Sequence, residues 1–325
     1  MIIVTGGAGF IGSALVWELN RRGNQDILIV DRLHRDQRWL NLRALAFADF
    51  VDQDEFIDDI RKRRFPGKID TILHLGACSD TTEQDAGFLL ENNYRYTKSL
   101  IEYACETDVR LIYASSAATY GDGGQGYDDN ESLLPKLRPL NMYGYSKQMA
   151  DLWAWRSGAL NKVAGVKYSN VFGPNEYHKG DMRSMIHKAY EQIRDEGKVR
   201  LFKSHRPDYA DGEQVRDFIY IKDAVNMTLA IADRPEINGI FNVGSGRARS
   251  WNDLGKAVSK AMNCKTEIEY IDMPKELRSR YQYHTCLSMD KSRGLGLEGA
   301  TYTLEQGIEE YVRGYLQPGV HLGDE

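Results

Sequence analysis

The sequence predicts an α/β fold in which a doubly wound parallel sheet carries helices on both faces and a smaller α/β domain adjoins it. Two observations predict this. Up to Gly173, short apolar runs alternate with segments of helical periodicity, a pattern typical of parallel strands joined by crossover helices. A glycine-rich turn, "TGGAGFIG", also joins the first expected strand to the first expected helix. Beyond Gly173 the pattern loosens into polar segments, which indicates the smaller domain.

The individual elements rest on local pattern. Buried strands are expected within the apolar runs 1–5, 26–31, 69–77, 109–121 and 164–173. Helical spacing predicts helices over 10–23, where Gly23 ends the pattern, and over 85–106. After the polar segment 174–214, strand-like runs return at 215–225 and 239–246.

These elements suggest two domains. We expect a nucleotide-binding domain formed by residues 1–169 plus about 217–246. A discontinuous substrate-binding domain would comprise about 170–216 plus 247–325. It would cover the carboxyl edge of the parallel sheet, where open α/β folds bind their ligands.

Composition excludes several classes of function. The 325 residues contain 42 Lys and Arg against 47 Asp and Glu, a net charge of −5, which argues against a nucleic-acid binder with a basic surface. Neither a secretory signal nor an apolar run of about 18 residues is found, so we expect a cytoplasmic protein without a membrane span. The four cysteines and the histidines lack zinc-binding spacing, so we expect buried free thiols and no metal site.

The glycine-rich turn predicts dinucleotide binding. Gly6, Gly9 and Gly12 would let the backbone turn tightly and approach a pyrophosphate at the helix N-terminus, as in Rossmann-like folds. Asp31 ends the second expected strand, where an acid accepts the ribose 2′-hydroxyl of NAD. The basic residues that follow it, Arg32, Arg35 and Arg38, suit a 2′-phosphate by bidentate hydrogen bonding. We favour NADP, with NAD and a merely solvated basic loop as the alternatives.

A second constellation carries proton chemistry. In "NMYGYSK", Tyr143 and Lys147 stand four residues apart and would share one face of a helix, whereas Tyr145 would point away. A lysine ammonium and a positive nicotinamide would both lower the tyrosine pKa from its ordinary value near 10. Ser116 follows an expected strand and could hydrogen-bond the reacting oxygen. A solvated helix face is the alternative for the Tyr-Lys pair.

The motifs "TGGAGFIG", "YASSAATYG" and "YGYSK" resemble the extended short-chain dehydrogenase/reductases that modify nucleotide sugars. Along essentially the whole chain, "GACSDTTEQD", "ENNYRYTK", "NVFGPNEYHKG", "RDFIYIKD" and "RYQYHT" most closely resemble the family of ADP-heptose 6-epimerases. That resemblance implies a Rossmann-like fold, NADP, an ADP-heptose substrate and a cytoplasmic homo-oligomer, typically a pentamer. It also implies a role in making the heptose precursor of lipopolysaccharide.

The resemblance also assigns roles to residues. Ser116, Tyr143 and Lys147 match the catalytic triad, and Lys179 in "HKG" matches a second acid/base residue. Cofactor-binding positions are matched by Gly6, Gly9, Phe10, Ile11, Gly12, Asp31, Arg32, Arg38, Leu75, Gly76, Ala77, Cys78, Ser79, Asn92, Lys147 and Val171. We expect substrate contacts from Ser79, Ser116, Asn170, Asp181, Lys188, Phe202, Lys203, Ser204, Arg216 and Tyr281. Asp181 departs from the family, where a serine commonly follows "HKG".

The expected reaction inverts C6 of the heptose through a 6-keto intermediate, with hydride leaving to bound NADP and returning. Tyr143 would serve the C6 oxygen in one position and Lys179 in the other; alternatively, Lys179 only grips phosphate. Arg216 would clamp the pyrophosphate, unless it forms a structural pair with Asp217 or another acid. A UDP-sugar 4-epimerase and a non-catalytic NADP-binding protein are the rival functions. A 4,6-dehydratase is disfavoured because Ala117 and Ala118 cannot transfer protons.

Overall fold

The computed structural model describes residues 1–33, 35–278 and 281–324, so Arg280, which opens one of the motifs above, lies outside them. Its larger layer is a seven-stranded sheet in the order β10-β6-β5-β4-β1-β2-β3, in which all neighbouring strands are parallel. The strands are β1 (Ile2–Thr5), β2 (Ile27–Asp31), β3 (Asp49–Asp52), β4 (Thr71–His74), β5 (Arg110–Ser116), β6 (Ala164–Tyr168) and β10 (Gly239–Val243). The predicted fold class is confirmed.

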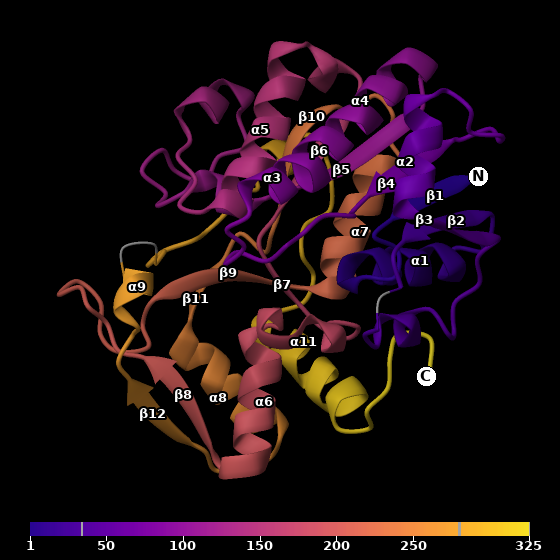
Figure 1. Ribbon diagram of the computed structural model, residues 1–325. Coiled ribbons are helices and arrows are strands. Elements are labelled where there is room, and N and C mark those ends of the chain that lie inside the picture. Colours follow the sequence, from indigo (N-terminus) through magenta and orange to yellow (C-terminus); the bar gives the residue numbers. More distant parts are fainter. Residues whose placement is uncertain (34, 279–280, 325) are drawn as a thin grey trace.

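Helices cover both faces of this sheet (Figure 1). The helices on one face are α2 (Gln53–Arg61), α4 (Tyr96–Thr107) and α5 (Met142–Arg156). Those on the other are α1 (Phe10–Arg21) and α7 (Ile221–Ala232). Helix α4 continues a short helix α3 (Ala86–Leu89) through a π-helical turn, η2 (Leu90–Arg95). The predicted helix over 85–106 therefore exists, although it is not α-helical throughout.

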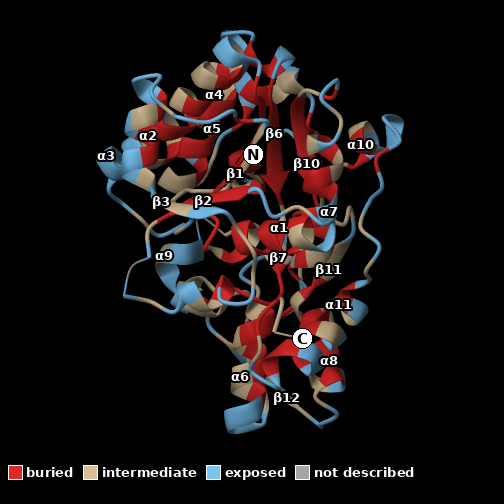
Figure 2. Cartoon of the chain, turned by 90° about the vertical axis from the view of Figure 1, so that its right-hand side faces the viewer, coloured by how far each residue is buried: buried red, intermediate tan, exposed pale blue. Residues whose placement is uncertain are grey.

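The core follows the sheet, as the buried colouring of the central strands in Figure 2 shows. Every residue of β2, β6 and β10 is buried. Strands that are covered on both faces need apolar side chains at consecutive positions rather than alternate ones. This requirement explains why these runs are recognisable in the sequence.

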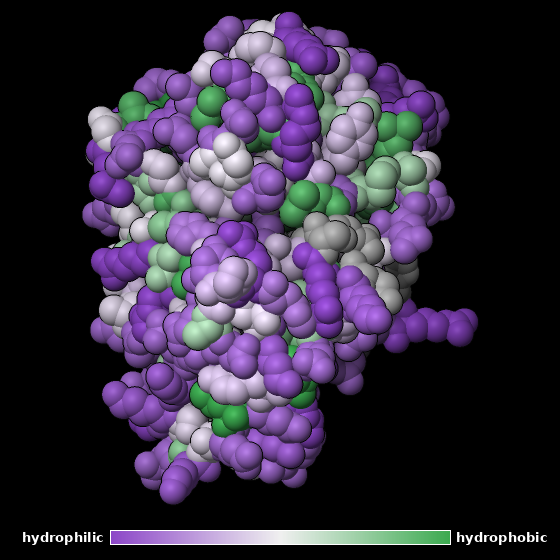
Figure 3. Space-filling view, turned by 90° about the vertical axis from the view of Figure 1, so that its left-hand side faces the viewer, coloured by the Kyte–Doolittle hydropathy of each residue, from purple (hydrophilic) through white to green (hydrophobic). Residues whose placement is uncertain are grey.

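The smaller layer lies at the opposite end from α4 and α5 in Figure 1. It holds a three-stranded sheet of β7 (Asn170–Phe172), β9 (Val215–Tyr220) and β11 (Ala248–Ser250), and a parallel pair of β8 (Lys198–Phe202) and β12 (Glu267–Ile271). Its helices are α6 (Met185–Glu196), α8 (Trp251–Ala261), α9 (Lys275–Arg278) and α11 (Leu304–Glu310), whereas α10 (Asp290–Gly294) lies beside β10 of the large sheet (Figure 2). On the face in Figure 3 the surface is mainly hydrophilic, with small, separate hydrophobic spots.

Two predicted strands differ from the structure. The run 164–173 is divided at Ser169, whose N–H donates to the Val243 carbonyl at 2.9 Å, so β6 stays in the large sheet and β7 joins the small one. The run 215–225 is a strand only to Tyr220, because Ile221 begins α7. Apolar residues are continuous across that junction, which hides the change from strand to helix.

The predicted domain boundaries can be compared with the sheets. Helix α7 and strand β10 lie with the large sheet, whereas β9 belongs to the small one. The division of the chain into two domains stays a prediction. Within the described ranges, no helix has the length and apolar character needed to cross a bilayer.

Candidate functional site

A cleft of about 970 Å³ lies at the carboxyl ends of the large sheet's strands and is lined by both layers. Every residue matched above to a cofactor-binding position lines it, as do Ser116, Tyr143 and Lys179. Of the expected substrate contacts, Ser79, Asn170 and Lys188 also line it. The fold therefore brings these residues into one cavity, and their individual roles stay predictions.

The glycine turn has no room for side chains. Gly6 has a φ of +67°, and a Cβ there would lie 2.7 Å from the Gly76 nitrogen. A Cβ on Gly12 would lie 2.0 Å from the Gly6 carbonyl oxygen. The N-terminus of α1 opens onto the cleft at Phe10, where backbone N–H groups and the helix dipole favour an anion. The turn therefore fits the pyrophosphate of a dinucleotide.

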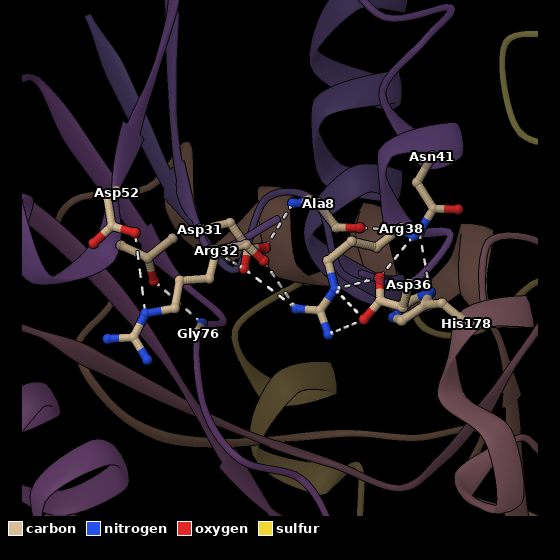
Figure 4. A network of polar contacts seen from close by, with 10 residues as sticks. Ala8, Asp31, Arg32, Asp36, Arg38, Asn41, Asp52, Gly76 and His178 are labelled. Carbon is tan, nitrogen blue, oxygen red and sulfur yellow. Dashed lines mark hydrogen bonds and ion pairs between the residues drawn. The ribbon is translucent and has the colours of Figure 1, made fainter. Parts of the chain in front are cut away.

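The corner beyond this turn holds both signs of charge (Figure 4). The Asp31 carboxylate accepts from the Ala8 N–H at 2.9 Å and lies 3.5 Å from Arg38, and burial raises the pKa of this carboxyl. Arg38 is paired with Asp36 at 2.8 Å. Both Arg32 and Arg38 line the cleft.

Of the next two arginines, Arg32 lines the cleft and Arg35 does not. Arg32 contacts Asp54 and lies 4.0 Å from Asp52. Arg35 is exposed and does not line the cleft. The two arginines available to a cofactor are thus already balanced by carboxylates.

Helix α5 presents the Tyr-Lys pair as its spacing predicts. Asn141 caps the helix by accepting from the Gly144 N–H at 2.7 Å. Tyr143 and Lys147 both line the cleft, whereas Tyr145 is 50% exposed and does not. The choice of Tyr143 over Tyr145 as the partner of Lys147 is therefore consistent with the geometry of the helix.

Burial has the largest effect on the pKa values of both Tyr143 and Lys147. Burial raises the pKa of Tyr143, and a hydrogen bond with Ser116 lowers it in part. Burial lowers the pKa of Lys147 to about 8, although the charge of Asp151 opposes this, and its Nζ donates to the Ala114 carbonyl at 2.8 Å. The protein alone therefore raises the Tyr143 pKa, and the expected lowering by Lys147 together with a positive nicotinamide stays a prediction.

A buried ion pair between Asp151 and Lys167 lies close to Lys147, and it was not predicted from the sequence. Asp151, one helical turn beyond Lys147, lies 2.6 Å from Lys167 of β6, and both side chains are about 1% exposed or less. Asp151 also accepts from Ser115 at 2.7 Å and Tyr113 at 3.1 Å. These contacts fix α5 against β5 and β6, and so set the position of the residues that α5 presents to the cleft.

Lys179 reaches the cleft from the smaller layer, in the short helical loop η6 (Tyr177–Met182). Its Nζ lies 5.3 Å from the centre of the Phe10 ring, an attractive cation–π geometry. Burial lowers the pKa of Lys179, and the fully buried Glu176 carboxylate raises it. An amine with a lowered pKa suits acid/base exchange near neutral pH better than an ordinary lysine does.

Several expected substrate contacts lie outside the cleft lining, namely Asp181, Phe202, Lys203, Ser204, Arg216 and Tyr281. Asp181 is exposed, and only its carbonyl oxygen contacts the site, by accepting from Lys188 at 2.6 Å. Lys203 lies 3.4 Å from Asp272, and the Ser204 N–H donates to Asp211 at 2.8 Å. The cleft is instead lined by Phe218 and Trp251, which the sequence did not single out.

Arg216 and Tyr281 contact Trp251, which lines the cleft. The Arg216 guanidinium lies 5.0 Å from the ring centre of Tyr281 and 5.6 Å from that of Trp251, whose Nε1 donates to the Tyr281 hydroxyl at 2.8 Å. The alternative pairing of Arg216 with Asp217 is wrong, because Asp217 accepts from Ser245 and other backbone groups instead. Among the described residues, Arg216 has no carboxylate partner.

The described residues show neither a cluster suited to a metal ion nor a disulfide. The described residues contain no cluster of three His, Cys, Asp or Glu side chains that could hold a metal. The cysteines are free thiols, but Cys264 is exposed and the other three are only partly buried, so the expectation of buried thiols is wrong.

Comparisons with known proteins agree with this geometry. Residues 2–244 match the model of the NAD dependent epimerase/dehydratase family. The chain is 55% identical over 316 residues to the ADP-L-glycero-D-manno-heptose-6-epimerase of Nitratidesulfovibrio vulgaris (strain DP4), covering 97% of this chain and 98% of that protein. It is 45% identical over 325 residues to the enzyme of that name from Fusobacterium nucleatum, covering 97% and 98%.

Solved structures show the same overall fold. The Helicobacter pylori ADP-L-glycero-D-manno-heptose-6-epimerase is 26% identical with a TM-score of 0.78, over 96% of this chain and 95% of that one. A UDP-glucose 4-epimerase from Thermotoga maritima is also 26% identical with a TM-score of 0.79, over 98% of each chain. Likeness of fold alone therefore does not separate the two activities, and the 55% and 45% identities given above are to ADP-L-glycero-D-manno-heptose-6-epimerases.

Proposed function

Because the chain belongs to the NAD dependent epimerase/dehydratase family and, within it, to the ADP-L-glycero-D-manno-heptose-6-epimerases, we propose that it converts ADP-D-glycero-D-manno-heptose to ADP-L-glycero-D-manno-heptose. The observation that carries this proposal is the 55% identity over nearly the full length of both proteins. The cleft supports it by gathering Ser116, Tyr143, Lys147 and Lys179.

Inversion of C6 requires that its hydrogen leaves and returns on the other face. A carbinol hydrogen is not acidic, so the proposed route oxidises C6 to a ketone and reduces it again. A nicotinamide dinucleotide, held by the glycine turn and α1, supplies the hydride acceptor and donor when bound. Tyr143 exchanges the hydroxyl proton, Ser116 hydrogen-bonds the same oxygen, and the Lys147 charge favours the tyrosinate.

Lys179 supplies the second proton partner in this scheme. C6 lies outside the sugar ring, so rotation about C5–C6 presents the other face of the ketone and moves its oxygen. The oxygen then needs a different group within hydrogen-bond reach. Lys179 and Tyr143 enter the cleft from different layers, on η6 and α5. We therefore assign one oxygen position to each side chain.

NADP is the proposed dinucleotide. Arg32 and Arg38 line the cleft next to Asp31, and guanidiniums bind phosphate by bidentate hydrogen bonds. A 2′-phosphate would have to compete with Asp52 and Asp54 for Arg32. NAD is the alternative, because a free 2′-hydroxyl needs only the Asp31 carboxylate.

The ADP moiety is proposed to extend toward Trp251. The unpaired Arg216 charge would hold the diphosphate, and Tyr281 and Phe202, whose ring centres are 6.3 Å apart, would contact the nucleoside. Lys188 and Asn170 would contact the sugar from the cleft wall. On the family resemblance alone, we also propose a cytoplasmic homopentamer.

The direct test is product analysis. The purified protein is incubated separately with ADP-D-glycero-D-manno-heptose and UDP-galactose, and each sugar is followed by NMR. Inversion at C6 of the heptose, without conversion of UDP-galactose, is expected. Conversion at C4 of galactose alone would favour the 4-epimerase, whose fold matches equally well. No change in either sugar would favour a non-catalytic dinucleotide-binding protein.

A further inference from the structure

The side chain of Asn41 joins the two parts of the site. Asn41 ends the short helix η1 (Arg38–Asn41) and is 1% exposed. Its Nδ2 donates to the Ala8 carbonyl at 3.0 Å, within the glycine turn, and to the Asn175 carbonyl at 3.1 Å, just before the Lys179 loop. Two carbonyl acceptors fix the orientation of the amide, since only its nitrogen can donate.

The third contact of Asn41 is with His178, the neighbour of Lys179 (Figure 4). The two nitrogens, Nδ2 and Nδ1, are 3.3 Å apart. Burial lowers the pKa of His178 to about 4, so the ring is neutral at physiological pH. Its Nδ1 can share one of the two amide hydrogens of Asn41 with a carbonyl acceptor. One amide group thus contacts the glycine turn and two residues that precede Lys179, Asn175 and His178.

A second asparagine anchors the same loop from the other direction. Asn175 is fully buried with a φ of +75°, a left-handed conformation that asparagine tolerates better than most residues. Its Nδ2 donates to Ser13 of α1 at 3.0 Å, and its Oδ1 accepts from the Leu322 N–H at 3.0 Å. These contacts leave the Asn175 carbonyl free to accept from Asn41, so the loop is held in one place against α1.

Resting on the proposed function, we propose that Asn41 is a positioning residue that holds Lys179 at the reacting oxygen by tying its loop to the dinucleotide-binding turn. It touches neither substrate nor reacting atoms. Tyr143 and Lys147 are placed independently, through α5 and the Asp151–Lys167 pair. Loss of Asn41 should therefore impair the step that uses Lys179 and spare the step that uses Tyr143.

The test compares Asn41→Ala and Asn41→Asp, which keeps the shape but removes the donor, with Asn20→Ala as a matched control. The Asn20 side chain likewise joins separate backbone segments, because its Nδ2 donates to the Asn24 and Ala46 carbonyls at 2.9 and 2.8 Å. Asn20 does not line the cleft. A shift of about 1 Å at a reacting group costs on the order of 100-fold in rate. We expect kcat for epimerisation to fall 10- to 100-fold in both Asn41 variants and to stay within about twofold in the control.

A second readout needs no substrate. The rate at which a small amine-reactive reagent labels Lys179 in the purified protein is measured against pH by mass spectrometry, which gives the pKa of Lys179. The groups around this amine are Glu176, His178 and the Phe10 ring, with Arg38 and Asp36 facing His178. Release of the loop into water should raise the Lys179 pKa toward its ordinary value in the Asn41 variants only.

The outcomes separate this inference from the proposed function. If wild-type protein turns over the heptose and both Asn41 variants match it in kcat and in Lys179 pKa, the inference is wrong. If wild type does not turn over the heptose, the proposed function fails, and the labelling profile alone decides whether Asn41 holds Lys179. Should Asn41→Ala not fold, Asn41→Ser, whose shorter side chain has one donor in place of two, must show the same direction of change in both readouts, and an unchanged profile would contradict the inference.

Discussion

The Nζ atom of Lys179 lies 5.3 Å from the centre of the Phe10 ring, so an amine from the smaller layer packs on the first turn of α1. This contact joins the dinucleotide-binding turn to the loop that approaches the sugar. In the proposed scheme, the site has two proton-exchanging groups of different origin, Lys179 on η6 and Tyr143 on α5. An enzyme that used a single acid/base group would not need a second one in its site.

The two-base scheme predicts a reciprocal defect. Lys179→Met should abolish epimerisation but still form reduced nicotinamide with one of the two heptose epimers, and Tyr143→Phe should do so only with the other. Loss of a positioned acid/base group costs about 10²–10⁴-fold in rate. Absorbance of the reduced cofactor after mixing checks this, with Tyr145→Phe and the exposed Lys68→Met as controls at wild-type rate. Near-normal turnover by Lys179→Met would rule out the scheme.

Activity should decline at alkaline pH. Burial lowers the pKa of Lys147 to about 8, so its ammonium is lost as pH rises through that value. The charge is needed to favour the tyrosinate form of Tyr143. A plot of kcat/KM against pH should therefore fall above about pH 8, and Lys147→Arg, whose guanidinium keeps its proton, should move that fall to higher pH even if its overall rate is lower. A profile that stays level to pH 10 in wild type would contradict this role.

Cofactor choice should depend on the arginines that line the cleft. Arg32→Ala and Arg38→Ala are each expected to weaken NADP binding by about 10-fold or more, the scale of a charge-assisted hydrogen bond, with little effect on NAD. Arg35→Ala is the matched control, because Arg35 is exposed and outside the cleft. Calorimetric titration of the cofactor-free protein measures both affinities. Equal losses for NADP and NAD would show that these arginines do not read the 2′-phosphate.

Acid should destabilise the fold through buried histidines. His74 is 1% exposed, lies 2.6 Å from Thr5 and 2.9 Å from Thr97, and burial lowers its pKa to about 3. The unfolded chain takes up this proton below about pH 6.5, whereas the folded chain does not until about pH 3, so the stability from neutral His74 is lost as pH falls across that window.

The size of this effect can be measured directly. Between pH 7 and pH 5, His74 should account for about 2 kcal/mol of the loss in unfolding free energy. Urea unfolding at the two pH values should show a smaller loss for His74→Gln than for wild type, and an unchanged loss for the exposed His205→Gln. An identical loss in wild type and His74→Gln would mean that His74 does not stay neutral in the folded chain.

Much of the site could be predicted because its residues stand in local patterns. The glycine turn lies between one strand and one helix, and helical spacing alone distinguishes Tyr143 from Tyr145. Lys179 has no such spacing and was found only through the motif that contains it. Strand β3 was missed because "DFVD" is polar at both ends and none of its residues is fully buried.

Other residues could not be predicted because distant chain segments bring them together. Asn41 contacts Ala8 and Asn175, and nothing near it in the sequence marks it out. Trp251 lines the cleft from the start of α8, where its place in the sequence is that of an ordinary helix residue. Asp151 stood at helical spacing from Lys147, a signal that could have been used, although its partner Lys167 lies on another element.

The measurement that tests the central claim most directly is epimerisation of ADP-D-glycero-D-manno-heptose in ²H₂O, followed by NMR of the product. If C6 is oxidised and then reduced by the same bound cofactor, its hydrogen never exchanges with water, so the L-epimer should carry ordinary hydrogen at C6. Deuterium at C6 of the product would contradict hydride return and require a mechanism in which C6 loses and regains a proton.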